Sequence, residues 1–291
     1  MIPIAYLQEW AARAPWPDFR QVEQDLIICR ALCDLFNSEA LAGKIAFRGG
    51  TAIHKLLFAR PLRYSEDIDL VQTHAEPIGP TIDAIRDALS WLGRCRREQV
   101  AHSTHLVFRF TPEEGSSSPL KLKVELNTRE HECVYRHKHY AFAIDSSWYQ
   151  GTTEIVSFEP EEIFGTKLRA LLQRHKNRDL FDLNQGLEQL SLDPVKVIEC
   201  FDHYLKLDGT PITRANAEKR MLEKLSGSLT EDIVPILPPG VSFTEADAVA
   251  AFSRVWTSLI AQIQGDPWKS SQFVIAEIRK SIPKLLNEQD G

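Results

Sequence analysis

The chain has 291 residues, of which 43% are hydrophobic and 25% charged, and its formal net charge is −6. This mixture is typical of globular proteins and excludes a disordered, collagen-like or coiled-coil chain. The acidic balance argues against a protein that coats nucleic acid without specificity, although it leaves room for a local basic groove.

The sequence features that bear on the cellular compartment all favour the cytoplasm. No window holds about 18 uncharged apolar residues, so no membrane-spanning helix is predicted. Residues 1–16 include Glu9 and Arg13 and lack the basic-then-apolar order of a signal peptide. The five cysteines are odd in number and scattered, which favours a reduced protein over a disulfide scaffold. We therefore expect a cytoplasmic protein without a membrane partner.

The first half of the chain alternates between helical and strand patterns. The first forty residues have apolar side chains at helical spacing, and residues 44–47 (KIAF) form a short strand that ends in a Gly-Gly-Thr turn and leads into a helix. Strands are also predicted at 67–71, 106–110 and 120–127, a helix at 81–93, and a hairpin or longer strand connection at 111–119. This part has an α/β pattern.

The second half shows only helical patterns. Pro160 with Glu161 and Glu162 makes a favourable helix start, because proline fits the first turn and acids suit the positive end of the helix dipole. Further helices are predicted near 194–206, 214–226, 244–263 and 269–286. The sequence therefore predicts an α/β domain over residues 1–157 and a helical domain over residues 158–291.

The turn Gly49-Gly50-Thr51 is the first candidate functional segment. It follows a strand and opens a helix. Glycines there let backbone N–H groups approach an anion closely, and a helix N-terminus favours negative charge. The alternative is a tight strand–helix turn without a ligand.

Asp67 and Asp69 form the second candidate segment. On a strand, residues two apart face the same way, with Cα atoms about 6.6 Å apart. Unpaired carboxylates at this spacing would raise each other's pKa, and a divalent cation such as Mg²⁺ would remove that penalty. The alternative, two solvated acids on an exposed strand edge, is less favoured because the glycine turn lies nearby in the sequence.

Glu125 is the third candidate, on the polar face of the strand at 120–127. If this strand pairs near Asp67 and Asp69, three carboxylates meet, and such a set can hold two metal ions about 3.5–4 Å apart for phosphoryl or nucleotidyl transfer. The alternative is a charged residue on a solvent-exposed strand face, paired with Lys121 or Lys123.

Basic residues gather in the segment 167–183 (KLRALLQRHKNRDLFDL). Between residues 166 and 178 there are five of them and no acid, namely Lys167, Arg169, Arg174, Lys176 and Arg178. Such a stripe suits the phosphates of a nucleotide or of RNA. The alternative is a solvated helix with internal ion pairs, which we favour for Arg169 and Lys176, and Arg178 is spaced to pair with Asp182.

Other signatures are weak or missing. The sequence contains no GxxxxGK[ST] and no GxGxxG motif, which argues against a P-loop ATPase and a Rossmann cofactor site. The run from His131 to His139 (HECVYRHKH) contains zinc-ligand types on a predicted strand, but its spacing is not that of a structural zinc site. We favour two other interpretations of this run, namely contacts with nucleic-acid bases or a solvent-exposed strand.

Residues 47–70 (FRGGTAIHKLLFARPLRYSEDIDL) resemble the signature of the AbiEii/AbiGii toxin family. Its members are nucleotidyltransferases of the DNA polymerase β superfamily, found in bacterial type IV toxin–antitoxin and abortive-infection systems. The segment 167–183 also resembles the family, so the match spans residues 47–183. The resemblance implies a nucleotidyltransferase fold, in which a mixed β-sheet is flanked by helices, plus a C-terminal helical bundle.

The resemblance further implies a role for each matching residue. The triphosphate of an NTP would be held by Gly49, Gly50 and Thr51, with Ser65 beside the acids as a control point. Mg²⁺ or Mn²⁺ would be bound by Asp67, Asp69 and Glu125, and Glu125 could instead act as a base toward the attacking hydroxyl. Phosphate charge would be neutralised by Lys167, and the RDxxD element would comprise Arg178, Asp179 and Asp182.

The activity implied by the resemblance is transfer of a nucleoside monophosphate from an NTP to an acceptor hydroxyl. The acceptor implied is the 3′ end of tRNA, and the partner implied is a cognate antitoxin. Two alternatives stay open at this point: the same chemistry on a protein or small-molecule acceptor, and a non-catalytic regulatory protein with the same fold.

Overall fold

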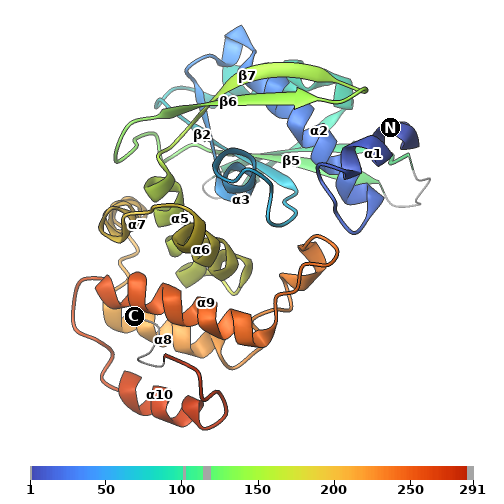
Figure 1. Cartoon of the computed structure of the whole chain (residues 1–291). Coiled ribbons are helices and arrows are strands. Elements are labelled where there is room, and N and C mark those ends of the chain that lie inside the picture. The colour runs from blue at the N-terminus through green and yellow to red at the C-terminus, as the bar shows by residue number, and fades with distance from the viewer. Residues whose placement is uncertain (1, 101–102, 114–118, 287–291) are drawn as a thin grey trace. The chain divides into compact units, whose positions relative to one another are not determined.

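A mixed five-stranded sheet organises the N-terminal part of the chain (Figure 1). Its strands are β1 (Ile45–Arg48), β2 (Asp67–Gln72), β3 (Cys95–Val100), β4 (Ser103–Phe110) and β5 (Leu120–Asn127), in the order β1-β2-β5-β4-β3. The β2–β5 pair is parallel and the other pairs are antiparallel. The mixed sheet predicted from the sequence is therefore confirmed.

Helix α2 (Phe19–Phe36) is the central helix of this part. It begins at Asp18, whose side chain accepts a hydrogen bond from the backbone N–H of Arg20 and so satisfies one free donor of the first turn. Its apolar residues form one core with the inward side chains of β2, β4 and β5, which alternate with outward polar ones. The remaining helical elements here are α1 (Ile4–Ala11), η1 (Glu39–Leu41), α3 (Gly49–Ala52), the π-helical turn η2 (Ile53–Leu57), α4 (Ile78–Ala88) and η3 (Ser90–Leu92).

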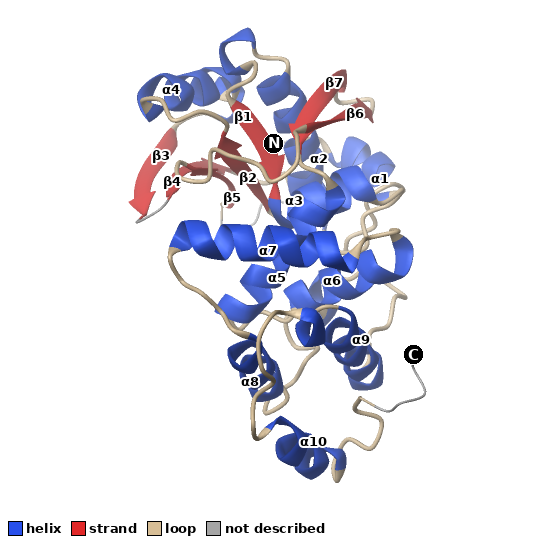
Figure 2. Ribbon diagram, turned by 90° about the vertical axis from the view of Figure 1, so that its left-hand side faces the viewer, coloured by secondary structure: helices blue, strands red, loops and turns tan. Residues whose placement is uncertain are grey.

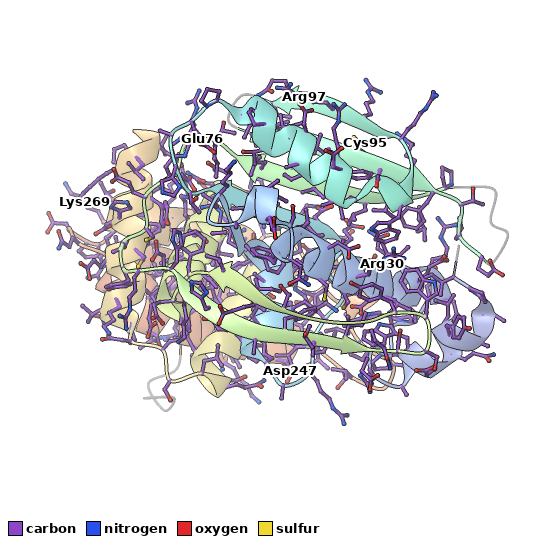
Figure 3. All side chains as sticks on the ribbon, turned by 90° about the horizontal axis from the view of Figure 1, so that it is seen from above. Arg30, Glu76, Cys95, Arg97, Asp247 and Lys269 are labelled. Atoms are coloured by element: carbon purple, nitrogen blue, oxygen red, sulfur yellow. The ribbon has the colours of Figure 1, made fainter. Side chains whose placement is uncertain are left out.

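A separate hairpin of β6 (Lys138–Asp145) and β7 (Gln150–Ser157) packs against α2 and β1, which Figure 2 shows in red beside the helices. The Ser157 hydroxyl donates to the carbonyl of Phe47 at 2.6 Å and ties the hairpin to β1. On α2, the guanidinium of Arg30 lies 3.8 Å from the ring centroid of Trp91 and 5.1 Å from that of Trp148, a cation–π arrangement (Arg30 is labelled in Figure 3).

Only helices occur in the described part of the chain beyond residue 157. They are α5 (Pro160–Gln173), α6 (Arg178–Gln189), α7 (Pro194–Asp208), α8 (Arg214–Lys224), η4 (Val234–Ile236), α9 (Glu245–Ser258), η5 (Ile260–Gln262) and α10 (Ser271–Arg279). The predicted helix start at Pro160 is confirmed. Buried Glu162 of the first turn also accepts a hydrogen bond from the Tyr204 hydroxyl at 2.7 Å, which links α5 to α7.

The computed structural model describes residues 2–100, 103–113 and 119–286, and the chain divides into two compact units. The α/β unit comprises residues 1–159 with 236–240, and the helical unit comprises residues 160–235 and 241–291. The single division predicted after residue 157 does not capture residues 236–240, whose Ile236 carbonyl accepts a hydrogen bond from the Tyr64 N–H at 2.8 Å. Among the described residues no helix is long and apolar enough to cross a membrane.

Several elements differ from the sequence-based prediction. Strand β3 and the β6–β7 hairpin were not predicted. Strand β3 is largely exposed on both faces, whereas β6 has a partly buried apolar face of Tyr140, Phe142 and Ile144 that was not recognised in the sequence. The strand expected through the run 131–139 is wrong, since residues 131–137 are irregular and β6 begins at Lys138. The predicted connection at 111–119 joins the antiparallel pair β4 and β5, with residues 114–118 outside the described part. Helix α10 ends at Arg279, because a helix continued through Pro283 would bring the proline ring against the Arg279 carbonyl.

Candidate active site

Strand β2 places Asp67 and Asp69 on the polar face of the sheet. Ile68 and Leu70 alternate with them and are buried at 0% and 1% exposure, which fixes the strand against the core. The two aspartates are half-buried and lie one pleat repeat apart on the same face. This is the arrangement that the sequence pattern predicted.

Parallel pairing brings Glu125 beside these acids. The register aligns Asp69 with Glu125 and Asp67 with Lys123. Buried Gln24 of α2 holds the strands in this register, because its side-chain amide donates to the carbonyl of Glu66 at 2.9 Å and to that of Lys121 at 3.0 Å. The three predicted metal-binding carboxylates therefore lie on adjacent strands.

The glycine turn lies directly against Asp69. Gly49 has a φ of +84°, and a Cβ atom at this position would come within 2.1 Å of the Asp69 Oδ2 atom. A Cβ atom at Gly50 would come within 2.7 Å of the Arg63 Nη2 atom. Only glycine allows the backbone to approach the carboxylate so closely.

Thr51 and Ser65 connect the turn to β2. The Thr51 hydroxyl donates to the carbonyl of Asp67, and its oxygen lies 2.7 Å from the Ser65 hydroxyl. Because Thr51 has given its only proton to Asp67, the Ser65 hydroxyl is the donor in the second bond. The two hydroxyls thus hold the start of β2 against the turn.

Lys123 lies between two of the acids. Its Nζ atom is 3.0 Å from the Asp67 Oδ2 atom and 3.3 Å from the Glu125 Oε2 atom, which also lies 3.1 Å from the His105 Nε2 atom. Burial lowers the pKa of Lys123, but the carboxylates of Asp67, Glu125 and Asp69 outweigh it and hold that pKa above its ordinary value. Lys123 therefore stays charged and neutralises part of the acidic cluster.

The donor set fits a divalent cation in part. Asp67 and Asp69 supply two hard oxygen ligands on one face, as Mg²⁺ and Mn²⁺ prefer. Among the described residues, however, no three acidic, histidine or cysteine side chains converge on a single point. Glu125 is turned toward Lys123 and His105, so a three-carboxylate site requires a rotation of its side chain.

Two of the predicted basic residues of the helical unit, Lys167 and Arg174, form an ionic cluster with buried acids. The Lys167 Nζ atom lies 3.0 Å from Asp179 Oδ1 and 3.1 Å from Asp182 Oδ2, and all three side chains are at least 94% buried. Arg174 also donates two hydrogen bonds of 2.7 Å to Asp179. Burial raises the pKa of Asp179, but Lys167 and Arg174 outweigh it and hold that pKa below its ordinary value.

The predicted basic stripe is largely neutralised. Besides Lys167 and Arg174, Arg169 pairs with Asp208 at 2.8 Å. The suggested pairing of Asp182 with Arg178 is replaced by the pairing of Asp182 with Lys167. Arg178 begins α6, and its backbone N–H donates to Asp232 at 3.4 Å. The stripe therefore offers less free positive charge than the sequence suggests.

The histidine-rich run at 131–139 is dispersed. His131 Nδ1 lies 2.8 Å from the Gln72 carbonyl, and His139 Nδ1 lies 3.0 Å from Glu154 Oε2. The Cys133 thiol donates to the Tyr135 carbonyl at 3.1 Å. These side chains thus contact separate partners.

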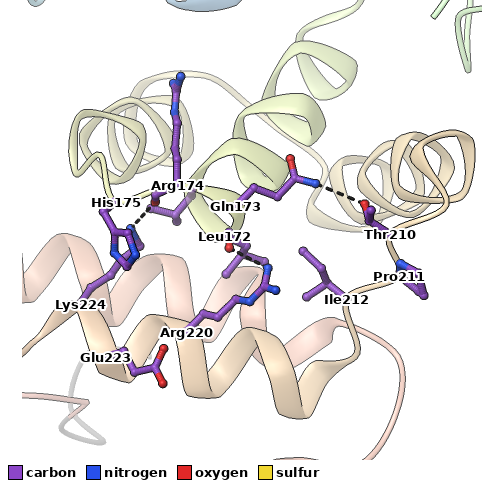
Figure 4. A pocket seen from close by; sticks show the side chains of 11 residues that line it. Leu172, Gln173, Arg174, His175, Thr210, Pro211, Ile212, Arg220, Glu223 and Lys224 are labelled. Carbon is purple, nitrogen blue, oxygen red and sulfur yellow. Dashed lines mark hydrogen bonds between the residues drawn. The ribbon is translucent and has the colours of Figure 1, made fainter. Parts of the chain in front are cut away.

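A cavity of about 440 Å³ opens in the helical unit beside the C-terminal end of α5 (Figure 4). Arg220 donates to the carbonyl of Leu172 at 2.9 Å, and Lys224 donates to that of Arg174 at 2.9 Å. These cations satisfy the free carbonyls at the negative end of the helix, which accounts for them structurally.

Three residues that contribute to the candidate site were not singled out from the sequence. Lys123 was considered only as an ion-pair partner of Glu125, although its alternation with Glu125 on one strand already places both on the same face. His105 and Gln24 come from other elements, β4 and α2, and carry no local pattern that marks them. The strand register brings His105 to Glu125, and the packing of α2 brings Gln24 to the carbonyls of Glu66 and Lys121.

The comparison with protein families identifies the chain. The family described as "Nucleotidyl transferase AbiEii toxin, Type IV TA system" matches residues 30–267, which is most of the sequence. The chain belongs to the AbiEii family. It is therefore a nucleotidyltransferase of the type IV toxin–antitoxin class, and this family implies an NTP substrate and an antitoxin partner.

Solved structures show the same fold as this AbiEii protein. MenT4, a nucleotidyltransferase toxin from Mycobacterium tuberculosis H37Rv, is 16% identical with a TM-score of 0.62, and the match covers 98% of each chain. JHP933 from Helicobacter pylori is 16% identical with a TM-score of 0.51, and the match covers 91% of this chain and 95% of that one. No curated protein sequence matches the chain.

Proposed function

We propose that this AbiEii protein transfers a nucleoside monophosphate from an NTP to the 3′-terminal hydroxyl of tRNA in the bacterial cytoplasm, and that a cognate antitoxin restrains it. The observation that supports this most directly is the contact between the Gly49 backbone and the Asp69 carboxylate, with Asp67 on the same face. A backbone turn that can receive phosphates thus adjoins the two acids.

In the proposed reaction, the acceptor hydroxyl oxygen attacks the α-phosphorus and forms a new P–O bond. The bond from the α-phosphorus to the bridging oxygen breaks, and pyrophosphate leaves. The hydroxyl proton passes to Glu125 or to water. Gly49, Gly50 and Thr51 hold the triphosphate through backbone N–H groups, and Ser65 orients Thr51 by the hydrogen bond described above.

Asp67, Asp69 and Glu125 would hold Mg²⁺ or Mn²⁺, and such an ion would offset the negative charge of the phosphates. Lys123 and His105 hold the Glu125 carboxylate through contacts of 3.3 and 3.1 Å, and Glu125 would have to turn away from them to join such an ion. In the helical unit, Lys167, Arg178 and Asp182 are proposed to serve the nucleotide. The pairing of Lys167 with Asp179 and Asp182 sets the position of the ammonium group within that unit.

The test is incubation of the purified protein with each of the four α-³²P-labelled NTPs and separate pools of tRNA, protein and small molecules. Label on tRNA that is lost after removal of the 3′-terminal nucleotide supports the proposal. Label on protein or on a small molecule, with none on RNA, would replace tRNA as the acceptor while leaving the chemistry in place.

A further inference from the structure

The polar face of the sheet carries basic side chains beside the proposed catalytic acids. Alternation along β5 puts Lys121 on the same face as Lys123 and Glu125. The register places Lys121 opposite Arg109 of β4, and Arg96 of β3 opposite Val107, two residues before Arg109. Three neighbouring strands therefore bring three basic side chains, Arg96, Arg109 and Lys121, to one region, here called the basic sheet face.

Two of these cations lie directly opposite each other. Arg109 and Lys121 are a cross-strand pair, in which Cβ atoms are about 4.5–5.5 Å apart and like charges are destabilising. Both side chains are exposed, and within the described ranges neither is within ion-pair distance of an acid. Arg96 pairs with Glu98 only at 3.5 Å, and that pair is exposed and therefore weak. An anion bound here would remove the repulsion.

This location differs from that of the glycine turn. Across the sheet, the turn follows β1, the acids lie on β2 and β5, and the basic sheet face spans the start of β5 with β4 and β3. The acids therefore lie between the two. A triphosphate at the turn and a second phosphate-bearing molecule on the basic sheet face would meet at the acids from opposite sides.

The segment 167–178 has more basic residues, but three of them, Lys167, Arg169 and Arg174, already pair with acids. The basic sheet face is therefore the better candidate for binding an anion. In a chain of net charge −6, a basic cluster beside the catalytic acids is a local feature. RNA is the ligand that fits it, because a polyanion can occupy several separated cations at once and its backbone contacts position the chain without reading its sequence.

We propose that Arg96, Arg109 and Lys121 bind the phosphate backbone of the acceptor RNA and guide its 3′ end to Asp67, Asp69 and Glu125. This inference rests on the proposed function. Lys121 precedes Glu125 by four residues on β5, about 13 Å along the strand, so the backbone contact and the reacting hydroxyl belong to different nucleotides of one RNA.

The variants that test the proposal are Arg109→Gln, Lys121→Gln and the double substitution. Arg97→Gln is the matched control, because Arg97 (labelled in Figure 3) is an exposed arginine that neighbours Arg96 on β3 and lies on the opposite face of the sheet. Binding of a fluorescein-labelled RNA oligonucleotide with a free 3′-hydroxyl is measured by anisotropy without NTP, over a series of salt concentrations.

We expect the double variant to bind this RNA about tenfold more weakly, with a slope of log K against log[salt] that is smaller by about 1.4, or about 0.7 for each lost contact. Arg97→Gln should match the unsubstituted protein. In the labelling assay, the double variant should show a raised KM for tRNA and an unchanged KM for NTP. Its melting temperature should be unchanged or higher, since a like-charge pair is removed.

Unchanged RNA affinity and salt slope in the double variant would overturn the proposal. A raised KM for NTP with unchanged RNA binding would also overturn it and assign these cations to the triphosphate. Failure of the proposed function gives a different pattern, in which the unsubstituted protein labels no RNA in the presence of any NTP.

Discussion

At the scale of single residues, the candidate active site depends on one position without a side chain. Gly49 adopts a positive φ of 84°, and its Cα hydrogen faces the Asp69 carboxylate. Any other residue would be strained in this conformation and would push the carboxylate away. The identity of residue 49 therefore determines where Asp69 lies.

Gly49→Ala is expected to abolish nucleotide transfer and to lower the free energy of unfolding by about 1–3 kcal/mol, because the added Cβ collides with Asp69 and the backbone is strained. Gly79→Ala is the matched control, since nothing lies within 4 Å of a Cβ atom there and its φ is not positive. Urea unfolding and the labelling assay measure the two effects. Full activity in Gly49→Ala would show that the close contact is not needed.

Lys123 is the second residue on which the electrostatics of the site depend. Its ammonium lies 3.0 Å from Asp67 and 3.3 Å from Glu125, so it competes with any cation for the same oxygens. Lys123→Met should therefore bind Mn²⁺ about tenfold more tightly, equivalent to ~1.4 kcal/mol. Calorimetric titration with MnCl₂ measures this directly. Weaker binding in the variant would mean that Lys123 supports the cation rather than competing with it.

At the scale of elements, the pairing of α5 with α6 rests on a buried ionic cluster. Lys167 pairs with both Asp179 and Asp182, which are fully buried, and Arg174 supplies the second positive charge. Removing the lysine would leave buried negative charge without compensation, which is strongly destabilising. This structural role exists alongside any contact of Lys167 with a nucleotide.

Lys167→Met should lower the free energy of unfolding by about 3 kcal/mol. This value is at the lower end of the range for removing one partner of a buried ion pair, because Arg174 still pairs with Asp179. Lys176→Met, at an exposed lysine of the same segment, should be neutral. Chemical denaturation of the two variants provides the comparison. Equal stability of both would mean that the cluster does not hold α5 and α6 together.

The elements that were predictable from the sequence are those with one buried face. The strand of Leu120, Leu122, Val124 and Leu126 and the amphipathic helices after residue 160 show their periodicity directly. Strand β3 could not be recognised, because an exposed edge strand needs no apolar alternation. Asp67, Asp69 and Gly49 stood out because they are local in the sequence. The contacts of Lys123 with Asp67 and of His105 with Glu125 depend on strand register, and those of Gln24 depend on the packing of α2, neither of which a short pattern encodes.

At the scale of the whole molecule, a mainly acidic region and a mainly basic region adjoin on one sheet face. The acids of β2 and β5 lie beside the basic sheet face of β3, β4 and β5, while the chain as a whole carries a net charge of −6. General repulsion of polyanions combined with local attraction favours binding at this site over binding elsewhere on the surface. The proposed transfer to one end of an RNA needs such selectivity.

The central claim is that Asp67 and Asp69, against the glycine turn, transfer a nucleotide to RNA. Its most direct test is labelling of tRNA from α-³²P-NTP by the unsubstituted protein and by Asp67→Asn, an isosteric change at a half-buried position that should leave the fold intact. We predict label at the tRNA 3′ end with the unsubstituted protein and a loss of at least a hundredfold with Asp67→Asn. Equal labelling by the two proteins would contradict the account.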